Sequence, residues 1–185
     1  MRNTTIVLLI AFLLLIAGCV RSLHQLYTDK DLVFEEKLLG TWSKEGENKD
    51  TWVFQKAGEN AYDLIVTEKG APAKFEAHLV KLGKFHFLDI APSDLDTKND
   101  FYKFHHLPVH TFSRIWLERN QFRLALLDND WLKDMIDQKK IDIKHEREDK
   151  AILLTAATED LQKLVTTYAE NPQAFPNPAK FLRQK

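Results

Sequence analysis

Hydrophobic and polar residues alternate with a period of two over much of the chain. The alternation runs through residues 51–56, 61–67, 74–81, 85–90, 111–118 and 121–127. Successive side chains of a β-strand point to opposite faces, so this period predicts half-buried antiparallel strands. The turns between them are short, as at Gly58-Glu59-Asn60 and Arg119-Asn120, and short turns join neighbouring strands. The pattern therefore predicts a meander of hairpins.

Two later stretches have a helical period instead. In the first, the stretch Asp128-Asn129-Asp130 is expected to cap the helix, and the apolar face comprises Trp131, Leu132, Met135 and Ile136. The second begins near Thr158 and stops at Asn171-Pro172, with an apolar face of Leu161, Leu164, Val165 and Tyr168. Between the two helices, 141–147 and 151–155 predict a further hairpin.

These elements predict one mainly β domain over residues 40–171, with about nine strands. We expect an antiparallel meander forming a curled sheet or small barrel, with an inserted helix and a C-terminal helix; the alternative is a two-sheet β-sandwich. Residues 172–185, with Pro176 and Pro178, are expected to be an irregular tail. The rings expected to share one interior are Trp42, Trp52, Phe54, Tyr62, Phe75, Phe85, Phe87, Phe112, Trp116 and Phe122.

The N-terminus has a different pattern, an unbroken apolar run from Ile6 to Ala17 behind a short basic start. This length is typical of a secretory signal and too short for a membrane span. Ile16-Ala17-Gly18-Cys19 follows, and it resembles the lipobox of bacterial lipoproteins, with Ile16 in place of the usual Leu. The resemblance implies that residues 1–18 are cleaved as a signal peptide and that Cys19 carries lipid. Residues 19–39 would then be the lipidated N-terminus and tether, and their apolar residues suggest that much of this segment lies against the body.

The composition agrees with a lipid-anchored protein of the cell envelope. Cys19 is the only cysteine, and a lone cysteine in an exported chain needs an explanation such as lipidation. By analogy with lipoprotein sorting, Val20 after it favours the outer membrane of a Gram-negative host. Lys and Arg total 26 against 27 Asp and Glu, a balance that argues against a nucleic-acid partner.

A second resemblance concerns the body of the protein. A helical turn that leads into Gly40-x-Trp42 on the first strand, followed by a meander and a late helix, is similar to the lipocalin layout. In that family the Trp closes the bottom of the barrel, so the resemblance implies this role for Trp42. The helix after residue 128 and the long crossing at 91–110 depart from the family. In this crossing, Phe101–Phe104 is expected to fold back onto the body.

Strand parity selects the candidate site residues. Asp89 shares a face with Phe85 and Phe87, and Arg114 shares one with Phe112 and Trp116. If those rings point inward, both charges do too, and a buried charge needs a partner. His145 and Arg147 follow Ile141 and Ile143 in the same way. The four would form the polar end of a pocket. Alternatively, each lies at a strand end and reaches water, or Asp89 and Arg114 form a structural pair. A further alternative is that Ile115 and Leu117, rather than Phe112, Arg114 and Trp116, lie on the buried face of their strand.

Other chemistry has little support in the sequence. His105, His106 and His110 are close together, but Pro108 argues against a helix that would align them, so we expect no metal and no cofactor. There is no nucleophile or phosphate-loop motif. The sequence therefore predicts a non-catalytic, lipid-anchored binding or interaction module whose partner is an envelope protein. The alternative is a lipocalin-like carrier of a small apolar ligand, and a distant third is an envelope hydrolase.

Overall fold

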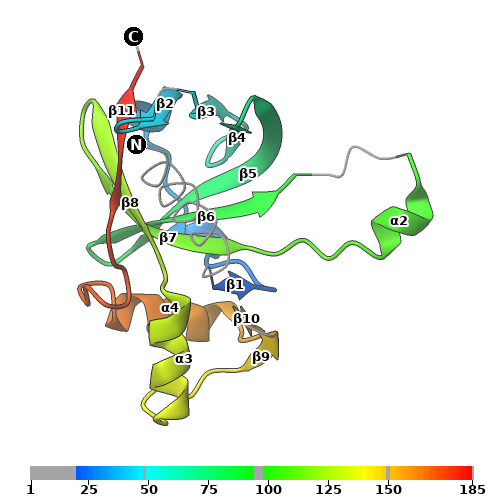
Figure 1. The fold of residues 1–185 in the computed structure, drawn as a ribbon, viewed down its shortest axis with the longest axis vertical. Helices are drawn as coiled ribbons and strands as arrows, with labels where there is room; N and C mark the ends of the chain where they lie inside the picture. The colour runs from blue at the N-terminus through cyan, green and yellow to red at the C-terminus, as the bar shows by residue number, and fades with distance from the viewer. Residues whose placement is uncertain (1–19, 48, 94–97, 149–150, 185) are drawn as a thin grey trace, which may run out of the picture.

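The computed structural model describes residues 20–47, 49–93, 98–148 and 151–184 (Figure 1). Ile16–Cys19, on which the lipobox resemblance depends, lies outside the described residues. Three helices and two 3-10 turns are present in the described ranges: η1 (Asp29–Asp31), η2 (Glu36–Leu38), α2 (Asp100–Phe104), α3 (Asn129–Asp137) and α4 (Thr158–Thr167). The strands are β1 (Arg21–Ser22), β2 (Gly40–Lys44), β3 (Thr51–Lys56), β4 (Tyr62–Glu68), β5 (Ala71–Leu82), β6 (Phe85–Pro92), β7 (Thr111–Leu117), β8 (Gln121–Leu126), β9 (His145–Glu148), β10 (Ala151–Leu154) and β11 (Ala179–Arg183).

Eight strands form a closed antiparallel barrel, in the order β2-β3-β4-β5-β6-β7-β8-β11 around the wall. From β2 to β8 each strand pairs with the next one in the chain, as the short turns predict. β11 pairs with both β8 and β2 and closes the ring. The predicted fold is confirmed: a mainly β meander closed into a small lipocalin-like barrel, rather than a two-sheet sandwich.

The prediction of an irregular tail after residue 171 is wrong, because residues 179–183 form the closing strand. Phe181 lies opposite Phe122 and its ring stacks on that ring at 4.7 Å between centroids. The strand has only five residues, just after Pro176 and Pro178, so it is too short for a clear period-two signal. It forms because β2 and β8 would otherwise have unpaired edges. The β domain therefore continues to residue 183.

One end of the barrel is closed by Trp42, Gly40 and Arg183. Trp42 is buried, and its Nε1 donates to the carbonyl of Leu38 at 2.8 Å. The guanidinium of Arg183 lies over the indole at 4.2 Å and donates through Nη1 to the carbonyl of Leu39 at 2.6 Å. Gly40 has φ +115°, and a Cβ there would lie 2.7 Å from Arg183 Nη1.

Hydrophobic side chains cover both faces of β5–β8. The interior cluster comprises Leu38, Trp42, Phe54, Tyr62, Leu64, Ala77, Leu79, Leu88, Ile115, Phe122, Leu124 and Phe181. The outer layer packs between the barrel wall and the segments outside it, and its buried members include Leu26, Val80, Phe87, Phe112, Ala125, Leu132, Ile152, Leu154, Leu161, Val165 and Phe175.

This second layer overturns the prediction of a single aromatic interior. Phe87 and Phe112 are buried in the outer layer, and Phe85 and Trp116 pack against it. On β7 it is Ile115 that belongs to the interior cluster, with Leu117 packed against that cluster, as the alternative prediction for this strand has it. Alternation along a strand cannot distinguish inside from outside when both faces are buried. As a consequence, Asp89 and Arg114 lie on the outer face of the barrel.

The segments outside the barrel gather at one side of it (Figure 1). α3 begins at the predicted cap, where the Asp128 side chain accepts from the Trp131 N–H at 2.8 Å. β9 and β10 form the predicted hairpin in shorter form, and β1 adds to it in parallel. Residues 20–39 pack against the body as predicted, with Leu26 and Leu38 fully buried. None of the described helices is long and apolar enough to cross a bilayer.

Residues 98–110, named here the aromatic arm, project from the barrel. Figure 1 shows α2 at the far end of this excursion, away from the rest of the molecule. Phe101 and Phe104 are exposed. The prediction that Phe101–Phe104 folds back onto the body is therefore wrong. Both barrel faces next to the arm already have their own apolar cover, which leaves these rings no site on the body.

Candidate functional site

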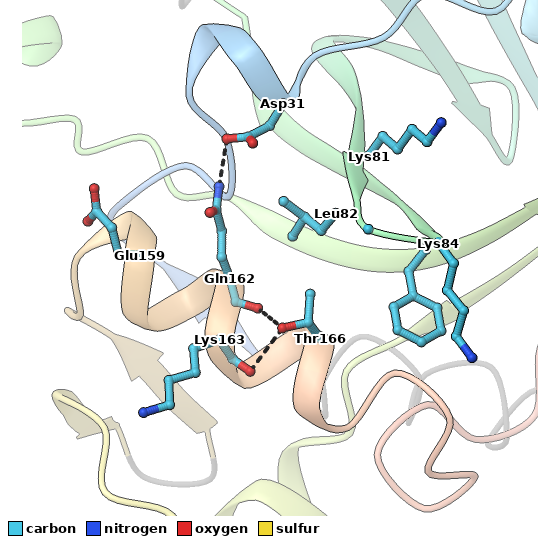
Figure 2. Close-up of a pocket in the computed structure, with 10 residues that line it drawn as sticks. Asp31, Lys81, Leu82, Lys84, Glu159, Gln162, Lys163 and Thr166 are labelled. Carbon is cyan, nitrogen blue, oxygen red and sulfur yellow. Dashed lines mark hydrogen bonds between the residues drawn. The ribbon is translucent and has the colours of Figure 1, made fainter.

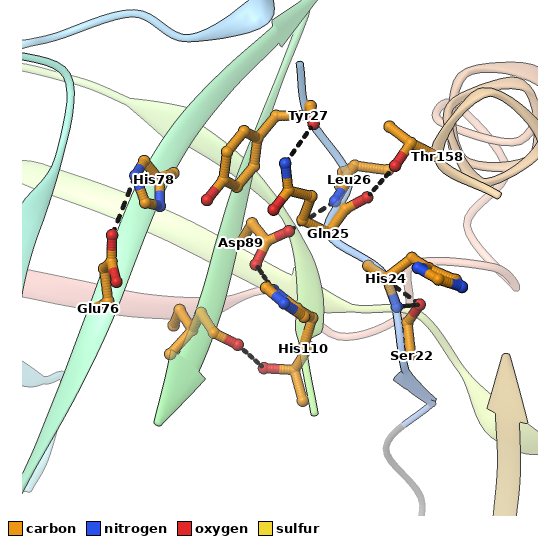
Figure 3. Close-up of polar contacts among 12 residues, drawn as sticks. Ser22, His24, Gln25, Leu26, Tyr27, Glu76, His78, Asp89, His110 and Thr158 are labelled. Atoms are coloured by element: carbon orange, nitrogen blue, oxygen red, sulfur yellow. Dashed lines mark hydrogen bonds and ion pairs between the residues drawn. The ribbon is translucent and has the colours of Figure 1, made fainter. Parts of the chain in front are cut away.

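Asp89 is buried on the outer face of β6, with 1% of its surface exposed. Both carboxylate oxygens have partners within the protein. Oδ2 accepts from the Leu26 N–H at 2.7 Å, and Oδ1 lies 2.7 Å from Nδ1 of His110 (Figure 3). A buried carboxylate is tolerated only when it is paired and hydrogen-bonded in this way. Asp89 therefore fastens the N-terminal segment and the base of the aromatic arm to the barrel wall.

Two rings from other elements shield this carboxylate. His78 is the cross-strand partner of Asp89 on β5, and the Tyr27 ring lies 4.4 Å from the His78 ring (Figure 3). Burial lowers the pKa of His78, although Glu76, 3.4 Å away, opposes this effect. Burial and then the charge of Asp89 raise the pKa of Tyr27. Both rings are consequently neutral at pH 7 and form a neutral cover over Asp89.

Arg114 lies on the same outer face and is the diagonal neighbour of Asp89, since its cross-strand partner is Phe87. Its guanidinium stacks on aromatic rings, 4.9 Å from the centre of Phe85 and 4.5 Å from that of Trp116. Arg123, the cross-strand partner of Trp116, lies over the same indole at 5.2 Å. Stacking on a ring uses the flat face of a guanidinium and leaves its N–H edge free to donate.

These side chains line a hollow of about 340 Å³, named here the arginine hollow. Two lysines around it are already paired with carboxylates, Lys37 Nζ with Glu35 at 3.3 Å and Lys84 Nζ with Glu170 at 2.8 Å. Glu118, also in the lining, accepts from the neutral amide of Gln121, so its charge offsets one of the two arginines.

The two arginines differ from these groups. Within the described parts of the chain, neither Arg114 nor Arg123 has a carboxylate at ion-pair distance. Burial lowers the pKa of Arg114; Glu170 opposes this, and the like charge of Arg123 adds to it. Burial also lowers the pKa of His86 at the rim, and the charge of Lys81 lowers it further. The hollow therefore holds a surplus of positive charge that an anion would balance.

A second hollow, of about 460 Å³, lies between the β5–β6 turn and α4 (Figure 2). Two of its lining groups bind each other: Gln162 Nε2 donates to Asp31 Oδ2 at 2.9 Å, and also to the carbonyl of Leu26 at 2.9 Å. Although burial raises the pKa of Asp31, hydrogen bonds from Thr28 and Gln162 lower it overall. This hollow is therefore a by-product of the contacts that hold α4 against the N-terminal segment.

The structure separates the four candidate pocket groups. His145 and Arg147 lie on β9, in the three-stranded sheet outside the barrel. Nδ1 of His145 lies 2.8 Å from the carbonyl of Ile143, and Arg147 forms an ion pair with Asp137 of α3. Asp89 and Arg114 share a face but do not pair with each other. Of the four, Arg114 lines the arginine hollow, and Cys19 lies outside the described residues.

Two of the three histidines of the arm, His105 and His110, contact protein groups. Nδ1 of His105 lies 2.8 Å from the carbonyl of Phe101, and His110 contacts Asp89. Across the described ranges, no group of three or more His, Cys, Asp or Glu side chains is placed to hold a metal ion.

The sequence reasoning missed the partners of Arg114, although a signal was available. The predicted turn at Arg119-Asn120 fixes the hairpin register and places Arg123 opposite Trp116, as observed. Arg114 is two residues earlier on the same face as Trp116. A cation-aromatic-cation cluster could therefore have been predicted from the hairpin, whereas the approach of Phe85 depends on the neighbouring strand β6.

Comparison with protein-family models, curated proteins and solved structures returns no match for this chain.

Proposed function

We propose that this protein is a lipid-anchored binding module of the cell envelope, without catalytic activity, whose site for an anionic ligand is the arginine hollow. The observation that carries the proposal is the pair of guanidiniums on one indole without a carboxylate partner in the described residues. The lipobox resemblance at Ile16–Cys19 supports the anchor and the envelope location.

The residues of the hollow suggest the class of ligand. A guanidinium is a planar fork that donates two parallel hydrogen bonds to a phosphate or carboxylate. Phe85 and Trp116 provide apolar walls beside the two forks. The volume of about 340 Å³ suits a small molecule or a single headgroup. We therefore propose a ligand with one phosphate or carboxylate group attached to a small apolar part.

The barrel interior supports the carrier alternative less well. Its rings touch one another, as in the Trp42–Phe122 and Phe54–Tyr62 pairs, whose centroids are 5.0 Å and 6.0 Å apart. Leu64 and Leu79 are fully buried beside them. An eight-stranded barrel either holds one small ligand or is filled by its own side chains, and these contacts favour the filled state.

Titration with inorganic phosphate, followed by NMR or calorimetry, tests the site. We expect the double variant Arg114→Gln/Arg123→Gln to lower the affinity at least about tenfold, because each charge-assisted hydrogen bond contributes about 1.5–3 kcal/mol. Arg119→Gln is the matched control, since Arg119 is an exposed arginine in the same hairpin and does not line the hollow. Equal affinity for all three proteins would contradict the proposal.

Native and denaturing mass spectrometry of protein purified from its own envelope extract identifies the ligand. A mass that is lost on denaturation and absent from Arg114→Gln/Arg123→Gln would support the arginine hollow. A mass absent only from Leu64→Trp, in a protein that remains folded, would support the carrier instead. With a filled interior, Leu64→Trp should destabilise the fold by about 1–3 kcal/mol or more.

The anchor is tested separately in a bacterial host. Cys19→Ala should remove labelling by a fatty-acid probe and leave the signal peptide uncleaved by the lipoprotein peptidase. Labelling that persists in this variant would contradict the proposed lipidation.

A further inference from the structure

The exposed large hydrophobic side chains of the described residues are all in the aromatic arm. Phe101 is 77% exposed, Tyr102 60%, Phe104 84% and Leu107 67%. The short helix that carries the three rings is capped by Asn99, whose side chain accepts from the Tyr102 N–H at 2.9 Å. An apolar cluster this exposed on a projecting segment indicates a contact surface.

The arm leaves the body at the point where the described chain begins. Ser22 and His110 form a two-way backbone bridge, with N–H to carbonyl distances of 2.9 Å and 2.8 Å. Cys19 is three residues before Ser22, and three residues reach no further than about 11 Å. The proposed lipid is thus within this distance of the arm's base.

The base of the arm is fixed to the barrel. His110 contacts the buried carboxylate of Asp89 at 2.7 Å, and Asp89 also binds the backbone of Leu26 in the N-terminal segment. From His110 to Phe104 the arm has six residues, which extend to no more than about 20 Å. A lipid on Cys19 and the rings of the arm therefore start from the same fixed point and can reach the same plane.

We propose that the aromatic arm inserts Phe101, Tyr102 and Phe104 into the interfacial layer of the bilayer that holds the Cys19 lipid. The inference rests on the proposed lipid anchor. Phe, Tyr and Leu side chains partition into membrane interfaces, and Tyr is enriched there.

The size of the surface favours a bilayer over a protein partner. Four exposed side chains are far fewer than the roughly 20–30 residues that each partner contributes to a stable protein interface. A bilayer needs no such complementary surface, because each ring that enters it contributes its own free energy of burial to membrane binding. The arm would add to the lipid a second attachment that sets the orientation of the barrel.

Site-specific fluorescence in the full lipidated chain tests this inference. Phe104→Cys introduces the only free thiol if Cys19 is acylated, and an environment-sensitive dye on it reports the surroundings of the arm. Glu59→Cys, at an exposed turn between β3 and β4, is the matched control. The proteins are reconstituted in vesicles of phosphatidylethanolamine and phosphatidylglycerol, with or without brominated lipid.

We expect the dye at position 104 to shift to the blue and to be quenched severalfold more by brominated lipid than the dye at position 59. A dye at position 104 that remains quenched by aqueous iodide, as at position 59, would overturn the inference and leave a protein partner as the occupant of the arm. The number of dyes per chain, measured by mass, tests the anchor independently. Two dyes per chain would show that Cys19 is free, and would overturn the anchor and with it this inference.

Discussion

Asp89 and Arg114 are diagonal neighbours on the outer face of one strand pair, yet their surroundings are opposite. Asp89 is buried and receives a backbone N–H and a histidine ring from two other segments. Arg114 receives two aromatic rings and a second arginine, and no described carboxylate pairs with it. The protein therefore supplies partners for the charge of Asp89, whereas no described carboxylate balances the charge of Arg114.

This difference separates a structural charge from a candidate binding charge. Sequence parity selects both residues for the same reason, since each is a charge on a strand face that is otherwise apolar. Only the segments that pack over the strands distinguish them. The N-terminal segment and the base of the arm cover Asp89, whereas the ring stack around Arg114 borders the arginine hollow.

The largest effect is expected when Asp89 loses its carboxylate. Asp89→Ala leaves the buried Leu26 N–H and the His110 ring without an acceptor, and each buried group left unsatisfied costs about 1–3 kcal/mol. Urea unfolding followed by tryptophan fluorescence measures the loss. Asp89→Asn is the control: its amide oxygen can still accept from Leu26, so we expect it to lose clearly less. A cost below about 1 kcal/mol for Asp89→Ala, within the range of ordinary surface changes, would contradict the structural role.

An intermediate effect is expected from pH. Burial lowers the pKa of His78 and of His86 below the ordinary value of 6.5. At a pH between 6.5 and these lowered pKa values, the unfolded chain therefore binds more protons than the folded one. The free energy of unfolding should therefore fall as the pH falls below 6.5 towards the lowered pKa values of the folded protein, by up to about 1.4 kcal/mol for each unit of pKa difference. His78→Gln should reduce this slope in denaturant titrations at several pH values. An unchanged slope would mean that His78 titrates normally in the folded protein.

A smaller effect on stability is expected when the arginines lose their charge. Arg114→Gln/Arg123→Gln removes stacking contacts worth about 0.5–1 kcal/mol each at exposed sites, but it also removes the repulsion between two like charges. We expect the free energy of unfolding to change by less than about 1 kcal/mol, while phosphate binding is lost. A loss of stability as large as that of Asp89→Ala would make Arg114 a structural group and remove the contrast.

The smallest effect is a shift in one titration curve. A bound anion favours a protonated imidazole beside it, so phosphate should raise the pKa of His86, which lines the arginine hollow. His78, which lies beside Asp89, should not respond. Histidine NMR titrations with and without phosphate measure both. Equal shifts would indicate a general salt effect and would contradict binding in the hollow.

The sequence predicted those parts of the fold that depend on local patterns. The turn at Arg119-Asn120 fixes one hairpin, and Asp128 caps α3 as its position suggests. The set of rings expected in one interior is wrong for Phe87 and Phe112, because an outer apolar layer makes them look like interior residues, whereas the alternative for β7 includes Ile115, which does lie inside. β11 was missed because its partners lie at a great distance in the chain.

The candidate site shows the same limit. Arg114 could be selected from strand parity, and Arg123 from the hairpin register, because both depend on neighbouring residues. That Asp89 is satisfied by Leu26 and His110 could not be predicted, because these contacts join segments that no sequence periodicity relates. Whether a charged side chain has partners depends on the tertiary structure. In this protein that difference distinguishes Asp89, a structural residue, from Arg114, a candidate binding residue.

The position of β11 has a consequence for how the barrel folds. Its partner β2 is the first strand of the barrel, so closure joins residues from nearly opposite ends of the described chain, and contacts of such long sequence separation form slowly. Until residues 179–183 have been synthesised, β2 and β8 each have an open edge that can pair with another chain. A truncated chain would therefore be prone to aggregation and proteolysis. Because β11 closes the barrel, the barrel can close only after the chain has been synthesised as far as Arg183.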